Sequence, residues 1–237
     1  LILSVAKREL SVFFDSLIAY VMLLVFLGFS GFFTWLYGND IFLVGQANLK
    51  TFFTISSWTL FFFIPAITMK MIAEEKKSGT LELILTKSIS DRQFIIGKFL
   101  GAVSLVLVAL VATFPYVITL SLIGDLDNGG TICGYFGLFL MTIAYAAIGI
   151  FSSSLTNNQI VAFMLSLVIC LFFHIIFDVL AANSSGIISW LFETLSLQTH
   201  FDSISRGVID SRDLVYFLSI TILGLFSAEL SLSKSHS

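Results

Sequence analysis

The stretch Met71–Phe99, MIAEEKKSGTLELILTKSISDRQFIIGKF, is crowded with charged residues and lies between two long apolar runs. The chain as a whole has 237 residues, of which 57% are hydrophobic and only 11% are charged. A soluble domain needs a more polar surface than this composition supplies, so the sequence indicates an integral membrane protein. The charged stretch is then predicted to be a loop between two spans. The formal net charge of −3 indicates no nucleic-acid partner.

Six apolar runs are long enough to cross a bilayer, because a transmembrane helix needs about 20 apolar residues. An open strand would leave backbone groups without hydrogen bonds in lipid, so all six are predicted to be helices. We therefore expect an all-α membrane protein that forms a single transmembrane domain over residues 1–237. The predicted spans are Leu17–Tyr37, Phe52–Ile72, Phe94–Ile123, Ile132–Ser152, Ile160–Ala181 and Leu214–Leu232.

The distribution of basic residues predicts the orientation, because cytoplasmic loops carry an excess of Lys and Arg. With the amino terminus in the cytoplasm, most of the 12 basic residues lie inside, and Lys50, Arg206 and Arg212 lie outside. Both termini are therefore predicted to be cytoplasmic. The loop at residues 73–93 is predicted to lie on the same side.

Residues 1–16, before the first span, are predicted to form an amphipathic helix that lies along the inner membrane surface. Its apolar face contains Leu10, Phe13, Phe14 and Leu17, and its polar face contains Lys7, Arg8, Ser11 and Asp15. The alternative is an irregular cytoplasmic start to the first span.

The segment at residues 182–213 is predicted to be the long external loop. It contains two short helix-like pieces, GIISWLFETL and HFDSISRGVID, with apolar residues at helical spacing. Aromatic residues such as Trp190 suit an interfacial or re-entrant position. Gly207 is predicted to end the second piece and Asp210 to cap the sixth span.

The charged loop divides into four parts. Glu74–Lys77 ends the second span and is predicted to be solvated, and Ser78-Gly79 breaks the helix. Thr80–Leu85 is predicted to form a short helix with Leu81, Ile84 and Leu85 on one side. Ser90 and Gln93 have the spacing of a capping box at the start of the third span. A short helix with an apolar face and charged neighbours suits the groove of a soluble partner. The alternative is a cytoplasmic turn that packs back onto the bilayer.

The stretch PAITMKMIAEEKKSGTLELILTKSISDRQFIIGKFLGA, residues 65–102, resembles the signature of ABC-2 type transporter permeases. Within that family the likeness is greatest to the gliding-motility-associated permease subunit. The likeness extends to SSWTLFFFIPAITM in the second span, GIFSSSLTNNQIVAF around the second cytoplasmic turn and HFDSISRGVIDSRDLVYF before the last span. It therefore covers nearly the whole chain.

The resemblance implies a multi-subunit exporter in a bacterial inner membrane. Two six-span permeases would form a dimer, and each would bind a cytoplasmic ABC ATPase through its first cytoplasmic loop. ATP and Mg would be held by the ATPase, with no cofactor or metal on this chain. A membrane-anchored accessory protein with a large external domain would join the complex in a gliding-motility role. The implied contacts with the ATPase are Glu74, Glu75, Gly79, Thr80, Leu81 and Glu82, extended by Ile84 and Leu85 along the short helix.

The sequence contains no G-x-x-x-x-G-K-[ST] phosphate-binding loop, so ATP hydrolysis is predicted to occur on a separate chain and this chain is not expected to be an enzyme. An ATP-independent channel or secondary transporter is the alternative reading. An intramembrane enzyme is a weaker alternative, because its usual clusters of catalytic residues are missing. A further alternative is a complex that does mechanical or assembly work and transports nothing. Such a complex would contact its ATPase through the same loop at residues 73–93.

His174 and Asp178 are four residues apart in the fifth span and are predicted to share one face of a helix. They form a candidate intramembrane polar pair, either a structural hydrogen-bonded pair, a proton relay or part of a metal site. Cys133 and Cys170 are expected to be small buried hydrophobic residues.

Two further features concern helix packing and turns. Pro65 and Pro115 are expected to kink the second and third spans, statically or as hinges. Ser152–Gln159 is predicted to be the second cytoplasmic turn, with or without a contact to the ATPase. Glycines are expected to allow helices to pack closely, either at a dimer seam or within the chain. The positions are Gly28, Gly31, Gly137 and Gly149.

Overall fold

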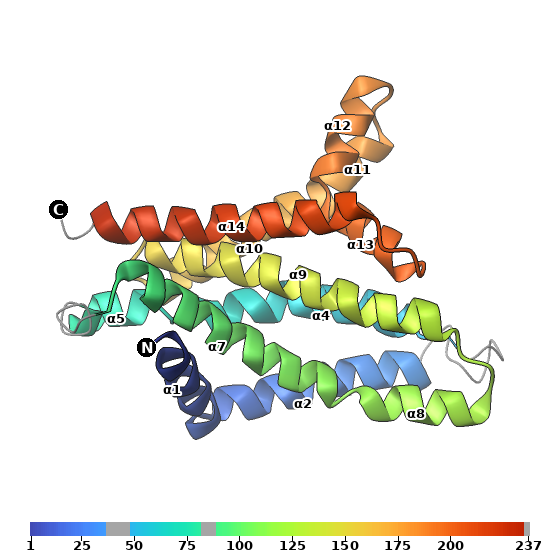
Figure 1. Cartoon of the computed structure of the whole chain (residues 1–237), viewed down its shortest axis with the longest axis horizontal. Helices are drawn as coiled ribbons and strands as arrows, with labels where there is room; N and C mark the ends of the chain where they lie inside the picture. Colours follow the sequence, from blue (N-terminus) through green and yellow to red (C-terminus); the bar gives the residue numbers. More distant parts are fainter. Residues whose placement is uncertain (37–47, 82–88, 235–237) are drawn as a thin grey trace.

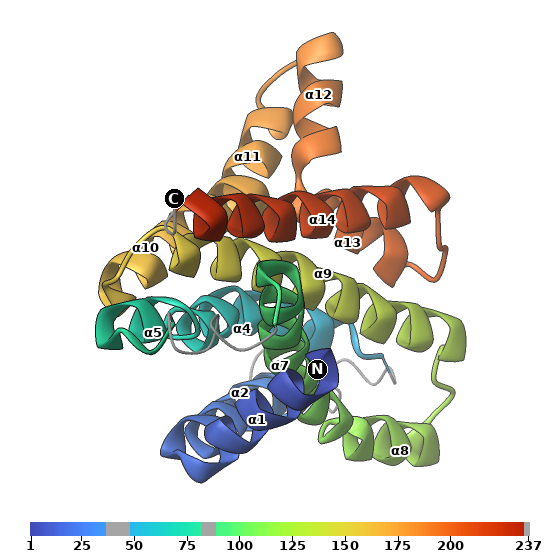
Figure 2. The ribbon, with the colours of Figure 1, turned by 60° about the vertical axis from the view of Figure 1, so that its left-hand side comes forward.

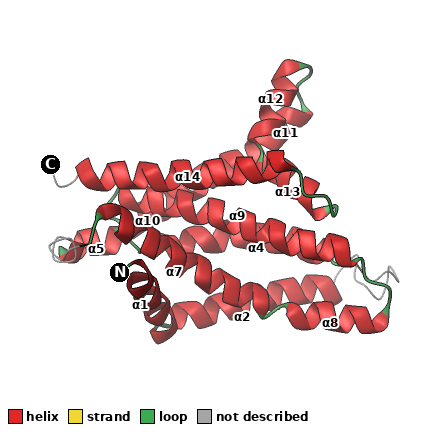
Figure 3. Ribbon diagram, in the orientation of Figure 1, coloured by secondary structure: helices red, strands yellow, loops and turns green. Residues whose placement is uncertain are grey.

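The computed structural model describes residues 1–36, 48–81 and 89–234, and every regular element in these ranges is helical (Figure 1, Figure 3). Within the described ranges, six helical segments are long and apolar enough to cross a membrane, in agreement with the number and order of the predicted spans. Their boundaries differ from the predictions by a few residues. The segments are Leu17–Trp35, Lys50–Ser78, Asp91–Ile123, Asn128–Ser154, Gln159–Ala182 and Ser211–Lys234.

Helix α9 (Asn128–Ser154) lies at the centre of the bundle. It packs against α4 (Lys50–Thr68), α7 (Asp91–Val111) and α10 (Gln159–Leu171) (Figure 2). It also packs against α13 (Leu197–Ser205) and α14 (Ser211–Lys234). Small residues permit these close approaches. A Cβ atom built on Gly149 would lie 2.0 Å from Thr68 Oγ1, and one on Gly134 would lie 2.4 Å from the Phe53 ring.

The glycines expected to allow close packing behave differently from one another. Gly149, Gly137 and Gly31 each face a side chain of another helix. Gly28, in α2 (Leu17–Trp35), has no heavy atom of another element within 4 Å of an added Cβ. The expected packing role is therefore met within this chain at three of the four positions, and a dimer seam stays a prediction.

The second span is broken near its end. Helix α4 contains Pro65 and ends at Thr68, and a turn at residues 69–72 leads into the short helix α5 (Ala73–Ser78). Gly79 then ends α5 with a φ of 70°, a left-handed conformation that favours glycine. The predicted helix break at Ser78-Gly79 is confirmed.

The third span consists of two helices. Ser90 caps α7 with the predicted capping box, in which its hydroxyl accepts from Gln93 N at 3.3 Å and its own N–H donates to Gln93 Oε1 at 3.4 Å. Helix α7 ends at Val111, and α8 (Phe114–Ile123) begins with Pro115 in its first turn. A proline cannot donate to the preceding turn, so the span breaks where the sequence predicts a kink.

The fifth span leaves the bundle near its end. A π-helical turn, Phe172–Ile176, separates α10 from α11 (Phe177–Ala182). Helices α11 and α12 (Ile187–Leu195) form a hairpin that projects away from the other helices (Figure 1, Figure 2). This arrangement confirms a helical segment after the fifth span, whereas its re-entrant placement in a membrane stays a prediction.

Helix α13 (Leu197–Ser205) returns the chain to the bundle before α14 (Ser211–Lys234). Gly207, with a φ of 94°, follows α13, and the Asp210 carboxylate accepts from Arg212 N at 3.0 Å. Both predicted boundary signals are therefore found at the expected positions.

Helix α1 (Ile2–Asp15) occupies the predicted amphipathic segment and joins α2 through an extended residue, Ser16. Its position relative to a membrane stays a prediction. Of the predicted apolar face, Phe13 is buried, Leu10 and Phe14 are half-buried and Leu17 is exposed. Val5, Ala6 and Glu9, which the prediction does not include, are buried as well. The buried face is therefore rotated and includes a carboxylate.

Candidate functional site

Three elements meet around Lys98 at the base of the charged loop. Lys98 lies on α7 and is only 2% exposed. Its Nζ donates a hydrogen bond to Glu75 Oε1 of α5 at 2.7 Å and lies 3.0 Å from Glu9 Oε1 of α1. Arg8 NH2 lies 3.5 Å from the same Glu75 oxygen at the rim of the site. The ion pairs connect the amino-terminal helix, the end of the second span and the start of the third.

Two glycines make this meeting possible. A Cβ atom built on Gly97 would lie 2.6 Å from Val5 Cβ, and one on Gly101 would lie 2.6 Å from Glu9 Cβ. The two glycines are four residues apart, so they lie on one face of α7 and let α1 approach it closely. Helix α1 is therefore held on α7 by backbone proximity as well as by charge.

The charges of this junction stabilise each other only while all of them stay in place. Burying an ammonium or a carboxylate is costly, and the cost is repaid only by good ion-pair geometry. Removing one partner of such a buried pair costs about 3–5 kcal/mol, because the other charge stays buried without compensation. The geometry around Lys98 thus makes the relative positions of α1, α5 and α7 interdependent.

A second junction attaches α5 to the end of α9. The Ser153 hydroxyl accepts hydrogen bonds from Ile72 N at 3.1 Å and Ala73 N at 3.0 Å, and it donates to Met69 O at 3.0 Å. One side chain therefore satisfies three backbone groups freed where the second span breaks. Nearby, Lys76 Nζ donates to Ser154 O at 2.5 Å.

A cavity of about 300 Å³ opens beside the Lys98 junction. Its lining includes Arg8, Lys70, Glu74, Glu75 and Thr80, so it carries charges of both signs. The cavity therefore presents polar groups and a rim with charges of both signs, which suits a protein partner rather than an apolar ligand.

The residues that the sequence predicts for the partner contact fall into three groups. Glu74, Gly79 and Thr80 are exposed. Glu75 and Leu81 are buried, with exposed fractions of 9% and 3%. The remaining three predicted contact residues, Glu82, Ile84 and Leu85, lie outside the described residues, as does most of the predicted helix Thr80–Leu85.

The prediction that Glu74–Lys77 is solvated is wrong for Glu75, whose carboxylate contacts Lys98, and only partly right for Lys76, which contacts Ser154. The physical reason is that the second span breaks before this segment, which turns one side of α5 toward α7 and α9. Leu81 likewise belongs to the hydrophobic core of this chain.

Sequence reasoning missed Glu9, Lys98, Ser153 and the glycine pair Gly97 and Gly101. The sequence does contain a signal for the two glycines, because a G-x-x-x-G spacing within an apolar run indicates a close helix contact. A lysine between these glycines, inside a span, was also a signal, because a charged residue there needs a partner.

The candidate intramembrane pair has separate partners in the structure. His174 Nδ1 lies 2.7 Å from the Tyr145 hydroxyl, and its ring stacks on Phe61 with the ring centroids 5.3 Å apart. Asp178 Oδ1 accepts from Thr199 Oγ1 at 3.3 Å. The π-helical turn that contains His174 changes the α-helical spacing on which the expected shared face depends.

Another buried histidine attaches α13 to α14. His200 Nδ1 lies 2.6 Å from Asp213 Oδ1, and Nε2 lies 3.1 Å from Thr194 O, so both ring nitrogens face acceptors. Cys133 and Cys170 are free and buried, as expected. In the described part of the chain, no three His, Cys, Asp or Glu side chains are grouped to hold a metal ion.

This arrangement joins a polar loop base to the ends of several membrane helices, which suits the transmission of a movement rather than a chemical reaction. The family profile described as ABC-2 family transporter protein matches residues 4–205 of the chain. A search of curated proteins found no match. The match covers most of the chain, which therefore belongs to the ABC-2 transporter family as a multi-pass membrane permease component.

Proposed function

We propose that this chain couples ATP hydrolysis by a cytoplasmic ABC ATPase to the movement of a substrate across or out of the bacterial inner membrane. ABC-2 permeases generally pair with ABC ATPase subunits. The loop at residues 73–93 would be the contact with the ATPase. Closure of the ATPases would move this loop and shift the spans between inward and outward states.

The observation that carries the proposal is the burial of Lys98 between Glu9 and Glu75. A force on the base of the loop acts on α5, and α5 is joined through this lysine to α1 and α7. Because breaking the buried ion pairs is costly, the three elements are expected to move together. Ser153 extends the connection to α9, the central helix.

The exposed residues Glu74, Gly79 and Thr80 are the proposed contact surface for the ATPase. The buried residues Glu75 and Leu81 would act indirectly, by holding this surface in place. Glu82 remains part of the proposal on the family resemblance, and Ile84 and Leu85 remain part of it on the apolar face that the sequence predicts for Thr80–Leu85.

The assembly is proposed to contain two permease protomers with both termini in the cytoplasm. A gliding-motility or surface-machinery role, with an accessory protein that has a large external domain, is the narrower proposal and rests on the resemblance to the gliding-motility-associated permease subunit. The apolar character of the spans favours an amphipathic or lipid-linked substrate over a hydrophilic ion.

The test separates binding of the ATPase from coupling. The chain and candidate ATPases encoded beside it are reconstituted, and association and permease-dependent ATP turnover are measured for Lys98→Met, Lys98→Arg and the control Lys7→Met, which is exposed on α1 and lies outside the loop. We expect Lys98→Met to retain association and lose most permease-dependent turnover, with Lys98→Arg intermediate and the control unchanged.

Equal turnover in Lys98→Met and the original chain would overturn the coupling role of the junction. If Lys98→Met does not fold, Arg8→Gln provides the second test, because Arg8 is at the exposed rim and its side chain is 55% exposed. The expected result is a smaller loss of turnover in the same direction, and no loss would contradict the proposal.

A further inference from the structure

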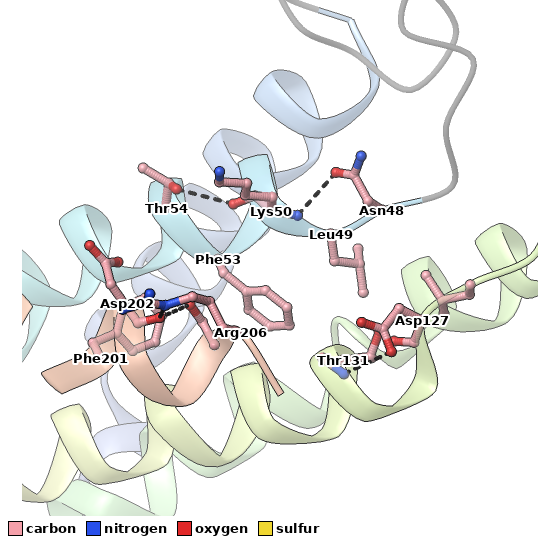
Figure 4. A pocket seen from close by; sticks show the side chains of 13 residues that line it. Asn48, Leu49, Lys50, Phe53, Thr54, Asp127, Thr131, Phe201, Asp202 and Arg206 are labelled. Atoms are coloured by element: carbon pink, nitrogen blue, oxygen red, sulfur yellow. Dashed lines mark hydrogen bonds between the residues drawn. The ribbon is translucent and has the colours of Figure 1, made fainter. Parts of the chain in front are cut away.

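A second cavity, of about 260 Å³, lies at the end of the bundle opposite α5 (Figure 1, Figure 4). The first turns of α4 and α9 and the helix α13 form its walls. Its buried floor contains the Phe53 and Phe201 rings and the Leu49 side chain. The predicted orientation puts this end of the molecule outside the cytoplasm.

Four charged side chains of both signs line the cavity: Lys50, Asp127, Asp202 and Arg206. Among the described residues, none of the four forms an ion pair. Arg206 Nε donates to the Asp202 carbonyl at 3.1 Å, which leaves its terminal nitrogens available (Figure 4). Two cations and two carboxylates around an apolar floor match a ligand with both charges and an apolar part.

An apolar groove of about 370 Å³ lies between α2 and α4, one turn further along α4 from the residues that line the cavity. Lys50, Thr54, Trp58 and Phe62 are exposed and follow one another at four-residue spacing on α4. The first two line the charged cavity and the last two line the groove. The stripe therefore leads from charge to hydrocarbon along the exposed surface of a single helix, turning by about 120° around the helix axis between Lys50 and Phe62.

The dimensions of the stripe fit one leaflet of a bilayer. Phe62 lies twelve positions after Lys50 in the α-helix, which is about 18 Å along the axis. One half of the hydrocarbon core is about 15 Å deep. A lipid with its headgroup at Lys50 would therefore extend its acyl chain past Trp58 to Phe62.

We propose that the cavity and the groove together bind one phospholipid with a zwitterionic headgroup. Its phosphate lies between Lys50 and Arg206, and its ammonium group faces Asp127 and Asp202. An acyl chain lies along the stripe to Phe62. The binding needs no ATPase, whereas the identification of this lipid as the transported cargo rests on the proposed function.

The experiment measures lipid adducts of the purified chain by native mass spectrometry in detergent. The probes are phosphatidylethanolamine, phosphatidylglycerol with the same acyl chains, and soluble phosphoethanolamine. Lys50→Gln/Arg206→Gln is compared with Lys77→Gln/Arg212→Gln, which removes the same charge from exposed positions outside the cavity. We expect the first variant to bind phosphatidylethanolamine about tenfold more weakly or worse, since it loses two charge-assisted contacts. The control should bind like the original chain.

The other probes test the two halves of the site. Phosphatidylglycerol lacks the ammonium and should bind about tenfold more weakly than phosphatidylethanolamine. Soluble phosphoethanolamine should give no adduct, because it leaves the groove empty. Equal binding of the two lipids, equal binding by the cavity variant, or binding of phosphoethanolamine as tight as the lipid would each overturn the proposal.

A measurement on the unmodified chain avoids dependence on any variant. Phosphatidylethanolamine with a photoreactive acyl chain should label the peptide that contains Trp58 and Phe62, and labelling confined to other helices would contradict the proposed path. Loss of ATPase association with intact lipid binding would reject the proposed coupling but leave the lipid site standing. Intact ATPase association without lipid binding would reject the lipid site but leave the proposed coupling standing.

Discussion

Lys98 and Glu75, 23 positions apart in the sequence, share a hydrogen bond of 2.7 Å in the interior of the protein. The bond joins the start of the third span to the end of the second, on either side of the charged loop. Glu9 of the amino-terminal helix completes the arrangement at 3.0 Å. The base of the loop is thus part of the buried core.

Replacing Lys98 with methionine should destabilise the protein strongly. The change keeps the volume of the side chain but leaves Glu9 and Glu75 buried without their cation. We expect a loss of about 3–5 kcal/mol of unfolding free energy. Thermal unfolding in detergent, followed by tryptophan fluorescence, measures the change. Lys77→Met, at an exposed position, is the control, and an equal effect in both variants would show that Lys98 has no special role.

Close packing of α1 on α7 should depend on the absence of side chains at Gly97 and Gly101. We expect Gly97→Ala and Gly101→Ala each to cost about 1–3 kcal/mol, because the added methyl group overlaps Val5 or Glu9. Gly28→Ala is the matched control, since open space surrounds Gly28. Hydrogen exchange of α1 amides reports the loosening, and unchanged exchange in both variants would refute the packing argument.

Ser153→Ala should loosen the break in the second span. The substitution removes the acceptor for Ile72 N and Ala73 N and the donor to Met69 O. Leaving such buried groups unpaired costs about 1–3 kcal/mol. Faster hydrogen exchange at residues 72 and 73 is the expected result. Ser219→Ala, which removes only an exposed bond within α14, should leave this exchange unchanged.

The orientation is tested by labelling single cysteines in a variant without Cys133 and Cys170. A membrane-impermeant maleimide should label Ser78→Cys only in inverted membrane vesicles and Ser185→Cys only in right-side-out vesicles. Both positions are exposed, so access depends on the side of the membrane. The opposite pattern would invert the predicted topology and exclude a cytoplasmic ATPase contact at Glu74 and Thr80.

The sequence was sufficient for the spans and for several boundaries. Long apolar runs are required by lipid, and local signals such as the capping box at Ser90 and Gly79 act within a few residues. These features depend on neighbours in the sequence, so the sequence of this one chain is enough to reveal them.

The charged junction depends on partners that are distant in the sequence. Glu75 stands beside Glu74, Lys76 and Lys77, a composition typical of a solvated turn, and only the fold brings it to Lys98. Glu9 faces inward because it pairs with the same lysine, and the buried face of α1 is therefore rotated toward Glu9. In the fifth span, the π-helical turn gives His174 a partner, Tyr145, that α-helical spacing does not predict.

The most direct measurement of the central claim is co-purification of this chain with the ABC ATPases encoded beside it. The account predicts a stoichiometric complex, and Glu74→Arg/Thr80→Trp should dissociate it while thermal stability stays unchanged, because both residues are exposed. Lys7→Gln, on the exposed face of α1, should leave the complex intact. If no ATPase associates under any gentle condition, or if Glu74→Arg/Thr80→Trp binds as well as the original chain, the proposed coupling through this loop is wrong.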